Sequence, residues 1–368
     1  MKLTFVLPNL RLYGGIKSTI AMADAMAGLG HEVTLVSPII PGRDGRGWFN
    51  LRKTAAQCWY TLQNLVHPPN WFNYRGKLRR PLRLTPNSLP AADFLILTWW
   101  ADVALLHDVP PEHGLPLHFV RSLETWGGPR EKVLATYQLD LPRIVSSGEL
   151  GTQLRQIGSD ALPGTISNGL DRIFTDLPFR VRPAQVPPRV GVLYRQQEWK
   201  RMDDALAVLT RCRRDRMLIP VFFGETPTRQ HRQLMREWQA EYHHLPSGDL
   251  LRSVYESLDV FLFTSDSTEA FGNPPFEALA ASVPVVTTDV GAVRELLQDG
   301  ESAIVCDVND LQALASGVLE LLDSPDSASA MARAGHRVAS GLHWDQSAQK
   351  LEAVLDRLLQ DSSATMPV

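Results

Sequence analysis

The chain has 368 residues, a length that predicts two domains and a hydrophobic core that needs no disulfide or metal to stabilise it. Its net charge of −3 argues against a protein that coats nucleic acid, and its 44% hydrophobic and 21% charged residues are typical of a globular enzyme. The three cysteines lie far apart and form no CxxC pair, which argues against a disulfide framework or a structural zinc site and favours a reducing, cytoplasmic location.

The first half of the chain alternates short apolar runs with one clear amphipathic segment. The run at 3–8 ends at Pro8 without a cleavage site, so we expect a strand there and not a signal peptide. Apolar residues at helical spacing predict a helix over 15–30. Near-continuous apolar runs, which are typical of parallel strands covered on both faces, predict further strands at 32–38, 94–99, 117–120 and 143–147. Together these elements predict a doubly wound α/β sheet.

The segment 43–83 differs in composition from the rest of this half. It holds nine basic residues, one acidic residue and seven aromatic residues. Basic side chains interleaved with aromatic ones suit an anionic membrane surface, here the inner face of the membrane, and they equally suit a loop folded against its own domain. RNA binding is the least favoured of the three interpretations. No run of about 18 apolar residues, the length needed to cross a bilayer, occurs in the chain.

A stretch with four prolines at 178–188 separates the two halves and is predicted to be a stiff linker. Beyond it the pattern restarts, with strands predicted at 189–195, 218–224, 260–265, 284–289 and 302–306 and helices at 200–212, 229–241, 248–257, 274–281 and 311–322. We therefore expect two Rossmann-like domains, 1–177 and 189–344, which face a central cleft. The C-terminal segment 345–368 is expected to hold a last helix, over 345–359, that crosses back onto the first domain.

The strongest motif is TSDSTEAFGNPPFE at 264–277, in which Glu269 and Glu277 are eight residues apart. The preceding strand delivers this loop to the carboxyl edge of the sheet, where ligands bind in open α/β folds. Gly272 permits close approach of the backbone to a ligand, Asn273 is a good helix N-cap, and Pro274 is a good first helical residue. The N-terminus of the following helix is therefore a ready site for a diphosphate.

The two carboxylates of this motif have functional and structural interpretations. Glu277, expected in the first turn of the helix, could accept both hydroxyls of a ribose or only stabilise the helix N-terminus. Glu269, on the loop, could orient a sugar hydroxyl, stabilise developing positive charge, or remain a solvated acid. Their spacing around the Phe-Gly-Asn-Pro sequence favours the functional interpretation.

This motif, followed by EALAASVPVVTTDVGAVRELLQDGESAIV, closely resembles the signature of glycosyltransferase family 4. The resemblance covers most of the chain and is strongest in its second half. It implies the GT-B fold and transfer of a sugar from a nucleoside diphosphate sugar with retention of configuration, without a metal or another cofactor. Consistent with this, the chain contains no DxD sequence.

The resemblance also assigns roles to individual residues. Arg195 and Lys200 match the family's phosphate-binding cations, which neutralise the leaving group, although they also suit a solvated pair at a helix start. With Glu269 they are the predicted catalytic residues. The predicted donor-binding residues are Gly14, Gly15, Asn168, Gly169, Phe271, Gly272, Asn273, Pro274 and Glu277. For Asn168 and Gly169, a simple turn is an equally good interpretation.

The acceptor side rests on fewer residues. HFVRSLETW at 118–126, and Tyr194-Arg195 where most of the family has Gly-Arg, resemble bacterial rhamnosyltransferases of surface polysaccharide assembly. Glu124 could contact an acceptor hydroxyl or the donor sugar, or be a structural carboxylate. His118 is the second acceptor candidate, and in such a strand it suits a packed core residue better than a catalyst.

The sequence therefore predicts a retaining hexosyl- or rhamnosyltransferase of polysaccharide biosynthesis that acts on a saccharide or lipid-linked acceptor. One alternative is a non-catalytic protein that binds a sugar nucleotide as the partner of another enzyme. The other is an NAD-dependent oxidoreductase. The sequence LRLYGGIKS at 10–18 argues against the latter because it lacks the GxGxxG spacing.

Overall fold

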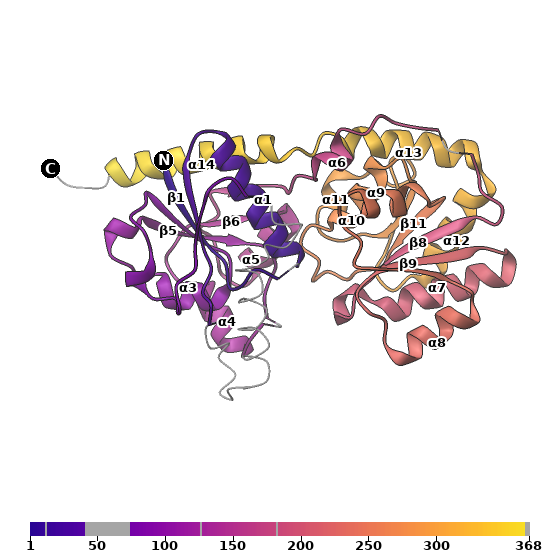
Figure 1. Cartoon of the computed structure of the whole chain (residues 1–368), viewed down its shortest axis with the longest axis horizontal. Helices are drawn as coiled ribbons and strands as arrows, with labels where there is room; N and C mark the ends of the chain where they lie inside the picture. Colours follow the sequence, from indigo (N-terminus) through magenta and orange to yellow (C-terminus); the bar gives the residue numbers. More distant parts are fainter. Residues whose placement is uncertain (12, 41–73, 126, 182, 365–368) are drawn as a thin grey trace. The chain divides into compact units, whose positions relative to one another are not determined.

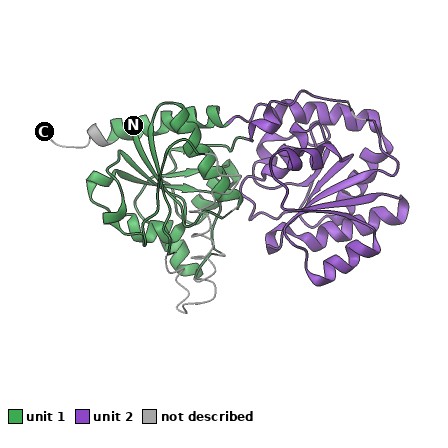
Figure 2. Ribbon diagram, viewed as in Figure 1, with its two compact units in different colours: residues 1–169, 344–368 green, residues 170–343 purple. Residues whose placement is uncertain are grey.

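The computed structural model describes residues 1–11, 13–40, 74–125, 127–181 and 183–364. The chain forms two compact units, coloured separately in Figure 2: unit 1 is Met1–Gly169 with Trp344–Val368, and unit 2 is Leu170–His343. Each unit holds one parallel β-sheet with helices packed on it (Figure 1). The predicted class, two Rossmann-like α/β domains, is confirmed.

The sheet of unit 1 has the strand order β3-β2-β1-β4-β5-β6-β7, and its described neighbouring strands are all parallel. β1, β2 and β4 are buried almost throughout because the sheet is covered on both faces, which explains their near-continuous apolar sequences. The elements are β1 (Lys2–Val6), α1 (Gly14–Gly28), β2 (Glu32–Val36), β3 (Lys77–Arg79), β4 (Phe94–Leu97), α3 (Trp100–Leu106), β5 (Leu115–Val120), α4 (Arg130–Thr136), β6 (Arg143–Val145), α5 (Gly148–Gln156), β7 (Gly164–Thr165) and α14 (Trp344–Ala364).

The last helix, α14, belongs to unit 1, although the whole of unit 2 separates it from the rest of that unit in the sequence. Its side chains Ala348, Leu351, Val354 and Leu355 are buried in one cluster with apolar residues of α1 and β1. The chain therefore crosses between the units twice, once after Gly169 and once after His343. The first crossing comes eight residues before the expected boundary at 177.

The sheet of unit 2 has the strand order β10-β9-β8-β11-β12-β13, again with parallel neighbours throughout the described residues. The elements are α6 (Arg172–Thr175), β8 (Arg189–Tyr194), α7 (Met202–Asp215), β9 (Ile219–Gly224), α8 (Arg229–Glu237), β10 (Glu241–His244), α9 (Gly248–Glu256), β11 (Val260–Phe263), α10 (Asn273–Ala280), β12 (Val285–Thr288), α11 (Val293–Leu296), β13 (Ile304–Cys306), α12 (Leu311–Asp323) and α13 (Pro325–Ala339).

The proline-rich stretch at 178–188 is not the linker that the sequence predicts. It belongs to unit 2 and hydrogen-bonds to it. The backbone N–H of Arg180 donates to Ser282 Oγ at 3.1 Å, and the side-chain amide of Gln185 donates to the carbonyl of Ser257 at 2.8 Å. The described residues of this stretch therefore belong to one unit instead of spanning the two.

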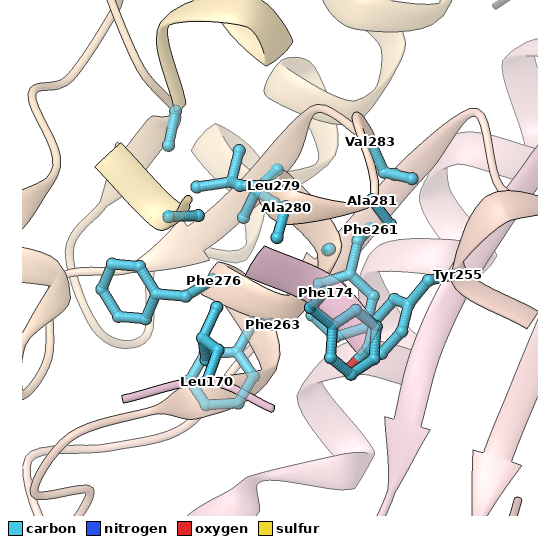
Figure 3. Packing of buried hydrophobic residues seen from close by; sticks show 14 of the residues in the cluster. Leu170, Phe174, Tyr255, Phe261, Phe263, Phe276, Leu279, Ala280, Ala281 and Val283 are labelled. Carbon is cyan, nitrogen blue, oxygen red and sulfur yellow. The ribbon is translucent and has the colours of Figure 1, made fainter. Parts of the chain in front are cut away.

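Two helices that follow neighbouring strands of unit 2 lie on opposite faces of its sheet. α7, which follows β8, contributes Met202, Leu206 and Leu209 to one hydrophobic cluster. α10, which follows β11, contributes Phe276 and Leu279 to the other cluster (Figure 3). The loops after β8 and β11 therefore diverge at the carboxyl edge of the sheet. The strand order reverses between β8 and β11, because β9 and β10 lie on one side of β8 whereas β12 and β13 lie beyond β11. Such a switch point is where open α/β sheets bind ligands.

Candidate functional site

The loops after β8 and β11 are joined by an ion pair between Lys200 and Glu269. Lys200 ends a short 3-10 helix, Glu198–Lys200, and its ammonium also lies 5.5 Å from the centre of the Phe263 ring. Ser265 Oγ donates to the same carboxylate oxygen of Glu269 at 3.1 Å. The side chains of Lys200 and Glu269 are 17% and 14% exposed, so the pair is largely shielded but still reachable from solvent. Two residues predicted to be catalytic thus meet at the switch point of the sheet.

Arg195, the first residue after β8, lies in the same loop as Lys200. Its Nη1 is 3.8 Å from Oε1 of Glu225, which follows β9. Glu225 also accepts the backbone N–H of Gln196 at 3.0 Å, so it holds the start of the loop. Sequence reasoning missed Glu225, although a carboxylate directly after a predicted strand is a signal that could have identified it.

Glu277 lies in α10, and its Oε2 accepts a hydrogen bond from the hydroxyl of Tyr255 at 2.9 Å. Figure 3 shows Tyr255 among the aromatic side chains of the core, where its ring lies 5.7 Å from Phe174 and 5.5 Å from Phe261. Burial and the nearby Glu277 carboxylate raise the pKa of Tyr255 well above its usual range, so the phenol keeps its proton and orients that carboxylate. Tyr255 was not predicted from the sequence.

The start of α10 differs by one residue from the prediction. The N-cap is Gly272, in the left-handed region at φ +82°, and Asn273 is the first helical residue, followed by Pro274. Only glycine adopts this conformation without strain, so it takes the place that the sequence suggested for Asn273. Glu277 consequently lies beyond the first turn, and no acidic residue lies in that turn. Pro274 and Pro275 carry no backbone N–H, so the helix dipole and the N–H groups of the other residues at this end are what could attract an anion.

Phe271 is packed in the hydrophobic core of unit 2 and is only 4% exposed, with its ring 5.5 Å from that of Phe276. Its side chain therefore does not face a ligand, and any contact to a donor would come from its backbone. Its carbonyl accepts the N–H of Ala292 at 3.1 Å, which fixes the loop from the side of β12.

Gly291, in the loop after β12, touches the backbone that carries Glu269. A Cβ at this position would lie 2.9 Å from the carbonyl oxygen of Glu269 and 2.9 Å from the carbonyl carbon of Ala270. Gly291 also has φ +56°. Sequence reasoning missed this residue, which the TTDVGAV stretch could have indicated, since a glycine directly after a strand often marks a close backbone approach.

The predicted glycines of unit 1 open α1 at the carboxyl end of β1. Gly14 and Gly15 are both exposed, and among the described residues beyond their own chain neighbours and helix backbone no atom lies within 4 Å of where a Cβ would be. The carbonyl of Gly15 accepts the hydroxyl of Thr19 at 2.8 Å, within the helix. β1 and β4 are neighbours at the switch point of this sheet, so the glycines lie where unit 1 would bind a ligand.

Asn168 and Gly169 lie where the chain leaves unit 1. Asn168 is buried, and its Oδ1 accepts a hydrogen bond from Nη1 of Arg121 at 2.7 Å. A Cβ on Gly169 would lie 2.4 Å from the backbone nitrogen of Trp344, so glycine is needed where the two crossing segments touch. Burial lowers the pKa of Arg121 to about 9. In this structure Asn168 and Gly169, which were predicted to bind the donor, stabilise the turn at which the chain leaves unit 1.

The two acceptor candidates lie inside unit 1. His118 on β5 is 0% exposed and stacks on Tyr137 at 5.4 Å. Burial and the nearby Arg143 lower the pKa of His118 to about 3, so it is a neutral packed residue and not an exposed catalyst. Glu124 is 5% exposed, and its Oε2 accepts the N–H of Trp100 at 2.9 Å, the first residue of α3. This bond fits the structural interpretation of Glu124.

Glu124 shares its surroundings with Asp102, a second buried carboxyl that sequence reasoning missed. Burial raises the pKa of Asp102 to about 7. Burial, with a further contribution from Asp102, raises the pKa of Glu124 well above its usual range. Both groups therefore stay protonated more readily than ordinary carboxylic acids.

The described residues contain no group of three or more His, Cys, Asp or Glu side chains placed to hold a metal ion. In the same part of the chain, no helix is long and apolar enough to span a bilayer. Of the predicted insertion 43–83, residues 43–73 lie outside the described residues.

Part of the chain matches a known protein family in sequence. A family model described as "Glycosyl transferases group 1" matches residues 176–338, which cover most of unit 2. The glycogen synthase of Mycobacterium tuberculosis is 30% identical over 194 residues, an alignment that covers 49% of this chain and 44% of that protein. The chain therefore spans less than half the length of this relative.

Solved structures resemble the chain over nearly its whole length. Anabaena Alr3699/HepE, solved in complex with UDP, has a TM-score of 0.72 at 14% identity, and the alignment covers 97% of this chain and 100% of that one. Sucrose-phosphate synthase from Thermosynechococcus elongatus has a TM-score of 0.70 at 15% identity, covering 98% and 100%. At such identities the likeness establishes the fold, which is the predicted GT-B fold.

The contact between Gly291 and the Glu269 loop leads to a prediction about stability. In Gly291→Ala, a methyl group would meet backbone atoms at 2.9 Å in addition to the strain of a positive φ. We expect urea denaturation to show a free energy of unfolding lower by roughly 2–4 kcal/mol, since overpacking and backbone strain add.

Gly248→Ala is the matched control because Gly248 also has φ +56° but has no atom within 4 Å of its Cβ position. It carries the strain alone, about 1–2 kcal/mol. Equal losses in the two variants would show that the Gly291 contact does not constrain the loop.

Proposed function

We propose that the protein is a retaining glycosyltransferase that uses a nucleoside diphosphate sugar as donor, because residues 176–338 match a family model described as "Glycosyl transferases group 1". The observation that carries the proposal is the cluster at the switch point of unit 2. Two cations, Arg195 and Lys200, lie in the loop after β8, and Lys200 pairs with Glu269 in the loop that leads into the N-terminus of α10, the helix that carries Glu277. Cations and a helix N-terminus together suit a diphosphate. The UDP complex of Anabaena HepE, which shares the fold, supports this donor class.

Donor binding would change the partner of Lys200. In the structure its ammonium is neutralised by Glu269. A diphosphate carries more negative charge than one carboxylate, so it would draw Lys200 away and free Glu269 to accept a hydroxyl of the donor sugar. Glu277, which Tyr255 orients, would accept the ribose hydroxyls.

In the proposed reaction, the bond between the anomeric carbon and the phosphate oxygen breaks, and its electron pair stays on that oxygen. The acceptor oxygen attacks from the same face, and its proton passes to the leaving phosphate. Configuration is retained, and no side chain acts as general base. Arg195 and Lys200 stabilise the charge that develops on the diphosphate, which supports a metal-independent reaction.

The acceptor would bind unit 1 at the carboxyl edge of its sheet. We propose a saccharide or lipid-linked acceptor and a hexosyl or rhamnosyl donor, as in polysaccharide biosynthesis at the cytoplasmic face of a membrane. The identity of Tyr194 and Arg195 after β8, typical of rhamnosyltransferases, supports this choice.

Lys200→Met tests the donor site. Methionine keeps much of the length of the side chain but loses the charge, which removes a charge-assisted hydrogen bond of about 1.5–3 kcal/mol. We expect nucleoside diphosphates to bind about 10- to 100-fold more weakly, as measured by calorimetry across a panel of bases.

Lys350→Met, on the exposed face of α14, is the control and should bind like the wild type. Unchanged affinity in Lys200→Met would contradict the assignment of the diphosphate to this loop.

Glu269→Gln separates donor binding from transfer. The amide keeps the size of the side chain but cannot hold Lys200 as an ion pair, so nucleoside diphosphate affinity should be kept or rise. Transfer at saturating donor should fall by about 100-fold or more, because the sugar loses an oriented carboxylate. Glu301→Gln, at an exposed loop position, is the control. Wild-type transfer by Glu269→Gln would exclude a role for this carboxylate in the reaction.

The described part of the basic insertion supports a contact with an anionic membrane. Of its cations, Arg75 pairs with Asp24 and Lys77 pairs with Glu32. Arg79 and Arg83 are exposed and form no ion pair within the described residues, and they are interleaved with Leu78 and Leu82, which are 38% and 64% exposed. Exposed arginines beside exposed leucines suit the interface of an anionic bilayer.

Liposome flotation tests this contact. The protein should float with vesicles that contain anionic lipid, and R79Q/R83Q should bind them roughly thirtyfold more weakly, at about 1 kcal/mol per cation. R229Q/R232Q, which removes the same charge from exposed positions of α8, should float like the wild type. Absence of flotation with any vesicle would discard the membrane contact.

A further inference from the structure

Tyr194, the last residue of β8, places a buried hydroxyl directly before Arg195. The residue is 1% exposed, so its oxygen needs partners within the protein. The backbone N–H of Thr228, the N-cap of α8, donates to this oxygen at 3.1 Å. The hydroxyl is 2.7 Å from Nδ1 of His231, in the first turn of α8.

The chain of hydrogen bonds continues from His231 to α7. Nε2 of His231 lies 3.0 Å from Oδ1 of Asp203. Because an aspartate carboxylate only accepts, Nε2 of the neutral imidazole carries the hydrogen and Nδ1 accepts from Tyr194. Every donor then has an acceptor: Thr228 to Tyr194, Tyr194 to His231, and His231 to Asp203. We call Tyr194, His231 and Asp203 the relay.

The relay links the two ends of residues 195–202, the segment that carries the proposed phosphate-binding cations. Tyr194 lies immediately before this segment, and Asp203 lies in the first turn of α7, immediately after it. Arg195 and Lys200 lie between them. His231 belongs to α8, outside the segment, so it clamps both ends to a third element.

Other contacts also hold this segment. Near its start, Glu225, which follows β9, accepts the backbone N–H of Gln196 at 3.0 Å. The carbonyl of Trp199 accepts the N–H of Asp266 at 2.8 Å, and the carbonyl of Arg201 accepts the hydroxyl of Thr264 at 3.2 Å. These bonds tie the segment to the loop after β11. The relay supplies the matching restraint on the other side, towards α8.

We propose that Tyr194, His231 and Asp203 are positioning residues that pre-form the phosphate-binding loop of this protein. None of the three needs to touch a ligand. They act by holding the backbone of Arg195 and Lys200 in the conformation that a diphosphate requires, which lowers the ordering cost of binding. The proposal rests on the proposed function, since it concerns the same diphosphate site.

Tyr194→Phe is the most direct test because it removes one oxygen and keeps the buried ring. Inorganic pyrophosphate and UDP are the probes, the first of which is independent of the base. We expect both to bind about tenfold more weakly by calorimetry, while kcat at saturating donor changes less than twofold. Hydrogen exchange of the amides at 195–203 should become faster, which reports the loss of restraint directly.

Four further variants separate positioning from general stability. Tyr137→Phe removes a buried hydroxyl of unit 1, one that hydrogen-bonds the backbone of Ser122 and Glu124, and should leave pyrophosphate affinity unchanged. Asp203→Asn keeps an acceptor oxygen for His231 and should retain most of the affinity that Asp203→Ala loses. The double variant Y194F/D203A should bind pyrophosphate no more weakly than whichever single variant has the lower affinity, because the effects of substitutions within one hydrogen-bond network are not additive.

The outcomes are distinguishable. Weaker binding with faster exchange at 195–203 supports the proposal. A lower Tm of Tyr194→Phe with wild-type affinity for both probes would mean that the relay only stabilises the fold, and would overturn it. Wild-type protein that binds neither pyrophosphate nor any nucleoside diphosphate would overturn the proposed function, and the relay proposal with it.

Discussion

The ion pair between Lys200 and Glu269 joins two loops that leave neighbouring strands, β8 and β11. Both side chains are mostly shielded from water, and charges in such a place are costly unless they are paired. The pair therefore keeps the two loops together when no ligand is bound. In the proposed function, Lys200 would contact the diphosphate and Glu269 the sugar, so donor binding would exchange the ion pair for contacts to the ligand.

The topology of unit 2 explains why these residues meet. The helices after β8 and β11 pack into different hydrophobic clusters on opposite faces of the sheet, so the two loops leave the carboxyl edge in different directions, at the place where open α/β sheets bind ligands. Contacts from three sides then hold the loops: Gly291 and Ala292 from β12, Glu225 from β9, and the Tyr194 relay from α8. Such support matters because a phosphate-binding loop acts only if its cations are already in place.

Much of this could be predicted from the sequence because the relevant signals are local. Parallel strands buried on both faces leave apolar runs, so β1, β2, β4, β8, β9, β11 and β12 were all anticipated. The motif at 264–277 is also local, since the strand, the glycine and the helix start follow one another. Glu269 could be named from this local motif, whereas Lys200 was assigned by the resemblance to glycosyltransferase family 4.

What the sequence did not reveal depends on partners that are distant in the chain. Tyr255 reaches Glu277, and His231 reaches Tyr194 and Asp203, through packing that no local pattern encodes. β3 and β7 were missed because strands of three and two residues are too short to show periodicity. β10 was missed too, because none of its residues is buried and its sequence has no apolar run.

Two errors had specific physical causes. Prolines fix an extended backbone equally well along a surface and between domains, so composition alone did not distinguish a packed segment at 178–188 from a linker. The N-cap of α10 was assigned to Asn273 by side-chain preference, but the chain needs a positive φ there, and Gly272 provides it.

The most direct test of this account is a crystal structure of the protein with a nucleoside diphosphate sugar bound. The account predicts diphosphate oxygens about 2.7–2.9 Å from the Lys200 ammonium and the Arg195 guanidinium, at the N-terminus of α10, with Glu269 released from Lys200 and turned to the sugar. A donor bound elsewhere, with the pair of Lys200 and Glu269 intact, would contradict it.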